Sequence, residues 1–172
     1  QMPNGSVQPQ HGFIRSAPAE QHGARGYWDG DEYTIELFGE VREATLFGEN
    51  LVLRRTIIAR LGEDTIHIHD QIENESCHEA PLMLMYHCNA GYPLLDQNSK
   101  LVMKTAITDC RDEVAEKGMA QESPLDFGAP VKGYQEQVFY HKLQAEQGRC
   151  RASLVNPDKQ LAFTVDFDQK EL

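Results

Sequence analysis

Alternation of apolar and polar residues predicts β-strands along most of the chain. The segment EYTIELFGEVRE, residues 32–43, alternates around a glycine. The segment from 49 to 76, ENLVLRRTIIARLGEDTIHIHDQIENES, has the pattern of a β-hairpin with LGED as its turn. The apolar positions expected on its two strands are Leu51, Leu53, Ile57, Ile66, Ile68 and Ile72.

The segment APLMLMYHCN, residues 80–89, is apolar at both alternating sets of positions, which is typical of a buried central strand. The remaining strand candidates are KLVMKTAI, EQVFYHKLQA, CRASLVN and QLAFTVDFD. One short helix is expected within DCRDEVAEKGMAQ, residues 109–121. About eight strands separated by turn signals indicate an all-β fold of antiparallel sheets, a sandwich or a large barrel in one domain.

Composition narrows the function classes. The chain has 172 residues, with 16 Lys and Arg against 27 Asp and Glu, and a net charge of −11. Nucleic acids and anionic membranes are bound through basic surfaces, so neither is an expected partner. No apolar run approaches the roughly 20 residues of a membrane helix. The first ten residues, QMPNGSVQPQ, have neither the charged nor the apolar region of a signal peptide.

The four cysteines, at positions 77, 88, 110 and 150, are widely spaced and form no CxxC motif. This spacing argues against a zinc site and against a dense disulfide framework. Reduced thiols and a cytoplasmic protein are therefore expected.

A polar pair ends the apolar segment in MYHCNAGYPLLD. With a period of two, Met83, Met85, His87 and Asn89 share one face of the predicted strand. Partial desolvation at this position would lower the pKa of His87 and make it a proton donor near neutral pH. The alternative is a histidine at the edge of the core that bonds a backbone carbonyl.

Two further segments carry candidate binding residues. In HGFIRSAPAE, His11 precedes a glycine and Arg15 offers a guanidinium fork, so this loop either lines a pocket or is a solvated turn. In GYQEQVFYHKL, Glu136 at the start of a strand either accepts hydrogen bonds from ligand hydroxyls or is an exposed carboxylate. Trp28, in GYWDGDEY, either stacks on a ring or packs beside a turn.

A metal site has a weaker basis. His67, His69 and Glu73 have the HxHxxxE spacing of a cupin metal site. They share their face with other polar residues, as on the solvent side of a strand, and the second cupin segment is absent. No metal is expected, and a cupin-like metal enzyme is the weaker alternative.

Five phrases in order resemble the aldose 1-epimerase, or galactose mutarotase-like, superfamily, and most closely its bacterial branch of uncharacterised aldose-epimerase-like proteins. They are HGFIRSAPAE, GEVREATLFGENLVLRRTI, IHDQIENES, LMLMYHCNAGYPLLD and GYQEQVFYHKL. The resemblance implies a β-supersandwich of antiparallel sheets with a sugar cleft. It also implies an isomerase that interconverts the α and β anomers of a free sugar without a cofactor.

Carried over to this sequence, the resemblance makes His87 the general acid and His11 the second catalytic histidine of the cleft. It makes Arg15, Asn89 and Glu136 substrate-binding residues. The general base of the family is a glutamate in a later strand, and no glutamate before Leu172 matches it.

Two interpretations follow. Either residues 1–172 are an internal portion of a longer mutarotase-like domain, or the chain is a carbohydrate-binding domain without the base. A small-molecule sugar is the expected partner in both cases. If the portion stands alone, its open sheet edges favour a homo-oligomer.

Overall fold

The computed structural model describes residues 11–172; the signal-peptide prediction concerns residues 1–10 and lies outside the described part. By their contacts the residues divide into two compact units, 1–85 and 86–172. Almost all regular structure is antiparallel β-sheet, so the predicted all-β class is confirmed. The assignment of residues 1–172 to one domain stays a prediction.

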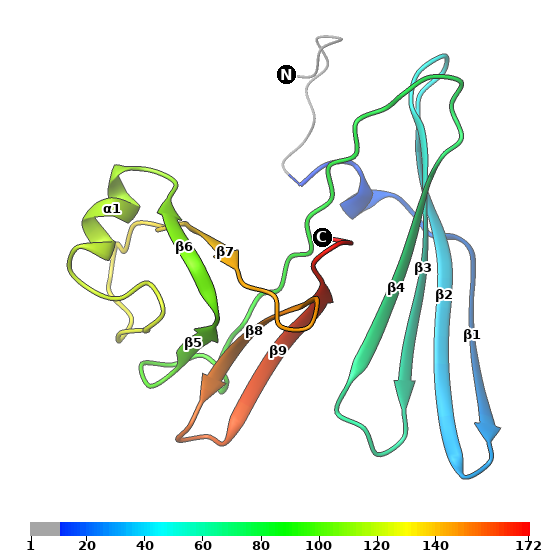
Figure 1. Cartoon of the computed structure of the whole chain (residues 1–172). Helices are drawn as coiled ribbons and strands as arrows, with labels where there is room; N and C mark the ends of the chain where they lie inside the picture. Colours follow the sequence, from blue (N-terminus) through cyan, green and yellow to red (C-terminus); the bar gives the residue numbers. More distant parts are fainter. Residues whose placement is uncertain (1–10) are drawn as a thin grey trace. The chain divides into compact units, whose positions relative to one another are not determined.

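The first unit contains a four-stranded antiparallel sheet in the order β1-β2-β3-β4 (Figure 1). The strands span Glu20–Asp29, Glu32–Ala44, Asn50–Arg60 and Ile66–Asn74. The predicted hairpin is β3 and β4: Ile57 pairs with Ile68, and Leu53 pairs with Ile72. Strand β1 was not predicted, because its sequence EQHGARGYWD shows no alternation. Trp28 near its end packs on Tyr33 across the β1–β2 turn, with ring centroids 5.1 Å apart.

The register gives this sheet two different faces. Paired residues on adjacent strands point to the same side, so Leu37, Ile57 and Ile68 share one apolar face. Arg55 and Asp70 form an ion pair on this same face, with Nε–Oδ1 and Nη2–Oδ2 distances of 2.7 and 2.6 Å. A bidentate ion pair therefore interrupts an otherwise apolar surface.

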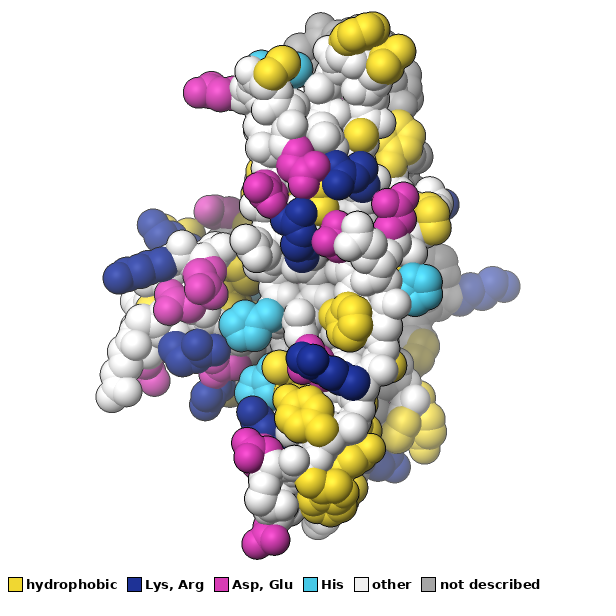
Figure 2. Space-filling model, turned by 90° about the vertical axis from the view of Figure 1, so that its right-hand side faces the viewer, with side chains coloured by type: hydrophobic (Ala, Val, Ile, Leu, Met, Phe, Trp, Pro, Cys, Tyr) yellow, Lys and Arg dark blue, Asp and Glu magenta, His cyan; other side chains and the backbone are white. Residues whose placement is uncertain are grey.

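The opposite face carries a network of charges. Arg54 bonds Glu40 and Glu75, each at 3.1 Å, and also Glu73. Hydrogen bonds from Arg42 and Arg54 lower the pKa of Glu75. On the face shown in Figure 2, basic and acidic side chains lie beside one another, so the excess negative charge forms no single-sign patch there.

The second unit contains two smaller antiparallel sheets. One has the order β5-β8-β9, and the other pairs β6 with β7. The five strands span Lys100–Met103 (β5), Thr105–Cys110 (β6), Phe139–Leu143 (β7), Arg149–Asn156 (β8) and Leu161–Asp168 (β9). The predicted strand KLVMKTAI is therefore split between two sheets. Cys150 and Leu154 of β8 are buried.

The predicted helix is confirmed as α1, Glu113–Met119. It begins there because the side chain of Asp112 accepts a hydrogen bond from the backbone N–H of Ala115 at 3.0 Å, which caps its first turn. Neither this helix nor the 3-10 turn η1, Ile14–Ser16, has the length and apolar character for crossing a membrane. All four cysteines are free thiols.

The prediction of a buried strand at residues 80–89 is wrong for the described chain. No described strand pairs with this segment, and Met83 and Met85 are 74% and 71% exposed. A strand exists only through hydrogen bonds to a neighbour, and apolar composition does not supply that neighbour. His87 and Asn89 are also exposed, so the expected desolvation of His87 is not observed.

Candidate functional site

The HGFIRS segment is a tight turn that leads into the sheet of the first unit. His11 and Gly12 both have left-handed backbone conformations, with φ of 69° and 70°. The carbonyl of Phe13 then accepts hydrogen bonds from Ser16 and Ala17 at 3.0 and 3.1 Å, which closes η1. His11 and Arg15 are both exposed. His11 and Arg15 therefore lie in a loop, as the sequence predicts. The sugar-binding roles of these side chains stay predictions.

A shallow apolar pocket of about 190 Å³ lies on the sheet of the same unit. Its lining residues are Ala19, Leu37, Phe38, Gly39, Val41, Arg55 and Ile57. A Cβ added at Gly39 would come within 3.2 Å of the Cβ of His22, so glycine permits the close approach of β1 here. The guanidinium of Arg55 places a fixed donor beside an apolar wall, an arrangement that suits a polar ring.

In the second unit, His87 and Asn89 precede a compact turn, residues 91–99. Two buried polar residues hold this turn: Ser99 is 1% exposed and Asn156 is 0% exposed. Sequence reasoning missed both residues. The Asn-Pro-Asp signal after β8 indicates a turn, but it does not reveal that the asparagine side chain bonds a segment about 60 residues earlier.

Glu136 forms an ion pair that the sequence did not indicate. Its Oε2 lies 2.9 Å from Nη1 of Arg111, and its side chain is 76% exposed. Arg111 also bonds Asp112 at 2.9 Å. The hydrogen bond to Asp112, and to a smaller extent the one to Glu136, raises the pKa of the Arg111 guanidinium. Glu136 lies three residues before β7 rather than at the start of a strand. It remains an exposed acceptor whose orientation is set by Arg111.

A second shallow pocket, about 250 Å³, lies beside α1. Tyr134 and three glutamines, Gln121, Gln135 and Gln137, line it together with residues of the helix. A Cβ added at Gly118 would lie 1.9 Å from Oε1 of Gln137, so the helix glycine leaves room for this amide. Glu136 itself does not line the pocket.

His141 of β7 is partly buried, and its Nδ1 lies 3.0 Å from Oγ1 of Thr108 on β6. Burial lowers the pKa of this imidazole, because desolvation disfavours its charged form. His141 thus stays neutral to lower pH in the folded protein than in the unfolded chain.

This pKa difference predicts a pH-dependent stability. Just below the ordinary histidine pKa of roughly 6.5, the unfolded chain binds more protons than the folded protein. The contribution of neutral His141 to the free energy of unfolding is therefore complete above that pH. It decreases as the pH falls below the ordinary histidine pKa. Urea unfolding at about pH 7.5 and pH 5.5 should show a smaller loss of stability for His141→Gln than for the wild type. Equal losses in the two proteins would contradict the prediction. His69→Gln, an exposed histidine on β4, is the matched control.

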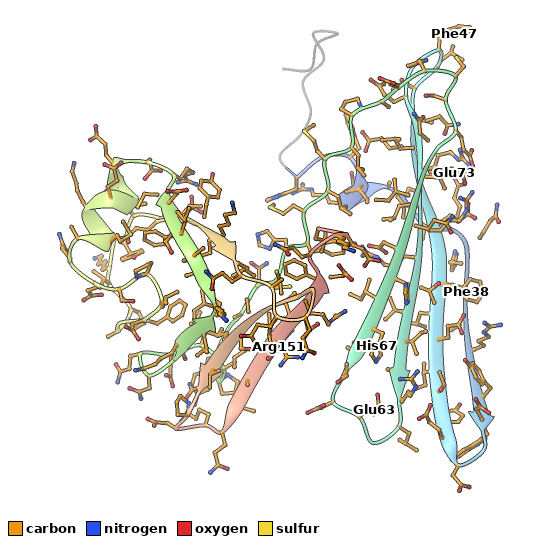
Figure 3. The ribbon with its side chains drawn as sticks, in the orientation of Figure 1. Phe38, Phe47, Glu63, His67, Glu73 and Arg151 are labelled. Carbon is orange, nitrogen blue, oxygen red and sulfur yellow. The ribbon has the colours of Figure 1, made fainter. Side chains whose placement is uncertain are left out.

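The cupin-like metal alternative gains no support from the geometry. His67 and Glu73 lie at opposite parts of β4 (Figure 3), and six residues of extended chain span roughly 20 Å. The carboxylate of Glu73 is bound to Arg54. Within residues 11–172, no three His, Cys, Asp or Glu side chains lie together in a way that could hold a metal ion.

The candidate residues are divided between the two units. His11 and Arg15 belong to the first unit, whereas His87, Asn89 and Glu136 belong to the second. Each unit therefore supplies part of the predicted set, and the catalytic and binding roles stay predictions.

Comparisons with known proteins agree with the all-β architecture. The chain is similar to a crystal structure of a "putative aldose 1-epimerase" from Klebsiella pneumoniae subsp. pneumoniae, with a TM-score of 0.88 and 22% sequence identity. The match covers 94% of this chain and 42% of that one, so the chain spans less than half the length of that protein. This likeness confirms the predicted aldose 1-epimerase-like fold. No curated protein matches the sequence. A family model matches residues 1–172 in full, and the chain belongs to that family, described as "Domain of unknown function (DUF4432)".

Proposed function

We propose that the chain carries part of the sugar site of an aldose 1-epimerase-like isomerase. The observation that carries this proposal is the fold shared over 94% of the chain with a protein described as an aldose 1-epimerase candidate. The ordered set of sequence phrases that resemble the same superfamily supports it independently. The substrate class is a free aldose, the reaction needs no cofactor, and the protein acts in the cytoplasm.

In this proposal, His87 donates a proton to the ring oxygen of the sugar while a base removes the proton of the anomeric hydroxyl. The C1–O5 bond breaks to give the open-chain aldehyde, the C1–C2 bond rotates, and closure on the other face gives the second anomer. Imidazole is the side chain most often used as a general acid, and the side chain of His87 is exposed, so a sugar can reach it. No glutamate up to Leu172 matches the base of the family, so we assign that role to no residue here.

The remaining side chains bind the sugar. His11 and Arg15 contact hydroxyls near the anomeric carbon, and Asn89 binds a hydroxyl beside the ring oxygen. Glu136, held by Arg111, accepts hydrogen bonds from further hydroxyls. Neutral sugars are recognised by planar polar groups of this kind next to apolar surface.

The proposal is tested by following mutarotation of several pure anomers, among them a hexose and a deoxysugar, with the full-length protein. We expect faster equilibration than in buffer for at least one sugar, and an unchanged rate after treatment with a chelator. Saturable binding of a sugar without faster mutarotation would support a non-catalytic carbohydrate-binding domain instead. A stoichiometric transition metal whose removal abolishes activity would support the cupin-like alternative.

A further inference from the structure

A buried polar pair, Ser99 and Asn156, joins the end of β8 to the turn that follows His87. The side-chain Nδ2 of Asn156 lies 3.3 Å from Oγ of Ser99 and donates to the carbonyl of Pro93 at 3.2 Å. The hydroxyl of Ser99 donates to the carbonyl of Leu94 at 2.8 Å and accepts a hydrogen bond from the backbone N–H of Asp96 at 2.9 Å. Two side chains thus fix three backbone groups of one turn.

The burial of this pair makes its geometry specific. A buried amide or hydroxyl is costly unless each polar atom finds a partner, so a satisfied buried network favours one conformation of the chain around it. Among residues 11–172, no buried side-chain nitrogen or oxygen lacks a hydrogen-bond partner. Oδ1 of Asn156 meets this condition by accepting from the backbone N–H of Lys159 at 3.2 Å.

Contacts at the surface strengthen the same junction. Nδ2 of Asn98 donates to Asp158 at 2.8 Å, and the ammonium of Lys159 lies 5.9 Å from the ring centroid of Tyr92. The backbone N–H of Leu95 donates to the carbonyl of Gly91 at 2.9 Å. The end of β8 and the turn that follows it therefore contact residues 92, 93, 98 and 99 of the 91–99 turn.

This junction matters because His87 and Asn89 lie in no described strand. Their segment is continuous with the fixed turn, which begins only two residues after Asn89. We infer that Ser99 and Asn156 are positioning residues that set the location of His87 and Asn89 through the turn at 91–99. The inference rests on the proposed function for the roles of His87 and Asn89, but the positioning itself does not need them.

The test compares Ser99→Ala, which deletes only the central hydroxyl, with Ser153→Ala. Ser153 lies on β8 and its hydroxyl bonds Thr164 at 2.8 Å, so the control loses a similar bond away from the turn. A misplacement of the acid by about 1 Å costs on the order of 100-fold in rate. We therefore expect kcat for mutarotation to fall about tenfold to a hundredfold in Ser99→Ala. We expect KM to change less than kcat, and Ser153→Ala to match the wild type.

The pH dependence of kcat separates positioning from loss of folded protein. Dividing kcat by the folded fraction measured at each pH removes the effect of lost folded protein, whereas a displaced His87 still shifts the corrected profile. Asp158→Ala, which removes only the surface bond to Asn98, is a milder variant. It should change kcat and the pH dependence of kcat in the same direction as Ser99→Ala does. It also keeps the test decisive if Ser99→Ala does not fold.

A second readout works without catalysis. NMR signals of the His87 ring should move in Ser99→Ala and Asp158→Ala and stay in place in Ser153→Ala. Unmoved ring signals in the first two folded variants overturn the inference. If the wild type accelerates no mutarotation while these signals move, the proposed function fails and the positioning role stands.

Discussion

Replacement of His87 by alanine is expected to lower kcat for mutarotation about 100-fold to 10,000-fold, with a smaller effect on KM. The imidazole supplies the proton that makes the ring oxygen a good leaving group, and water replaces it poorly. Polarimetry on a pure anomer measures the effect directly. A His87→Ala protein that equilibrates anomers at the wild-type rate would show that another group is the acid.

A matched control for this prediction is His67→Ala. His67 is an exposed histidine on β4, opposite Ile58 of β3, and the proposed mechanism gives it no role. The mutarotation rate of His67→Ala should stay within about twofold of the wild-type rate, since substitutions of exposed residues away from a site change stability and geometry little. Loss of activity in His67→Ala but not in His87→Ala would indicate that the active site lies on β4 and would favour the metal-enzyme alternative.

The sequence predicted the fold well where the determining pattern is local. Alternation over residues 49–76 was sufficient to place β3, β4 and their turn, and the observed register pairs two of the predicted apolar positions, Ile57 and Ile68. The helix expected within residues 109–121 is α1, and its cap at Asp112 lies in the same short segment. Each of these features depends on neighbouring residues, whose periodicity and capping chemistry can be recognised in one segment.

Prediction failed where a feature depends on a distant partner. Residues 80–89 have the composition of a central strand, but no described strand pairs with them. In the same way, the residues that fix the turn after His87 were not recognised, because Ser99 and Asn156 are 57 positions apart. The ion pair of Arg111 with Glu136 was likewise not recognised, because the two residues are 25 positions apart. Local pattern gives the preference of a segment, and only tertiary pairing decides whether that preference is satisfied.

The ion pair on the apolar face of the first sheet leads to the second large prediction. Asp70→Asn should lower the free energy of unfolding by about 2 kcal/mol, because the amide leaves the Arg55 guanidinium without its matching carboxylate. The Asp70 side chain is 6% exposed and that of Arg55 is 37% exposed, so the effect should lie below that of a fully buried pair. Urea unfolding measures it.

Glu73→Gln is the matched control, because it is the same carboxylate-to-amide change on the same strand. Glu73 meets Arg54 on the charged face and is 53% exposed, and such pairs contribute about 0–1 kcal/mol. The double variant Arg55→Met, Asp70→Leu should recover most of the loss, since apolar side chains there extend the surface formed by Ile57 and Ile68. Equal destabilisation by Asp70→Asn and Glu73→Gln would mean that the pair behaves as an ordinary surface salt bridge. The expected recovery in the double variant would show that the ion pair is not needed for stability. Its role would then be another one, such as holding the Arg55 guanidinium in place over the apolar pocket.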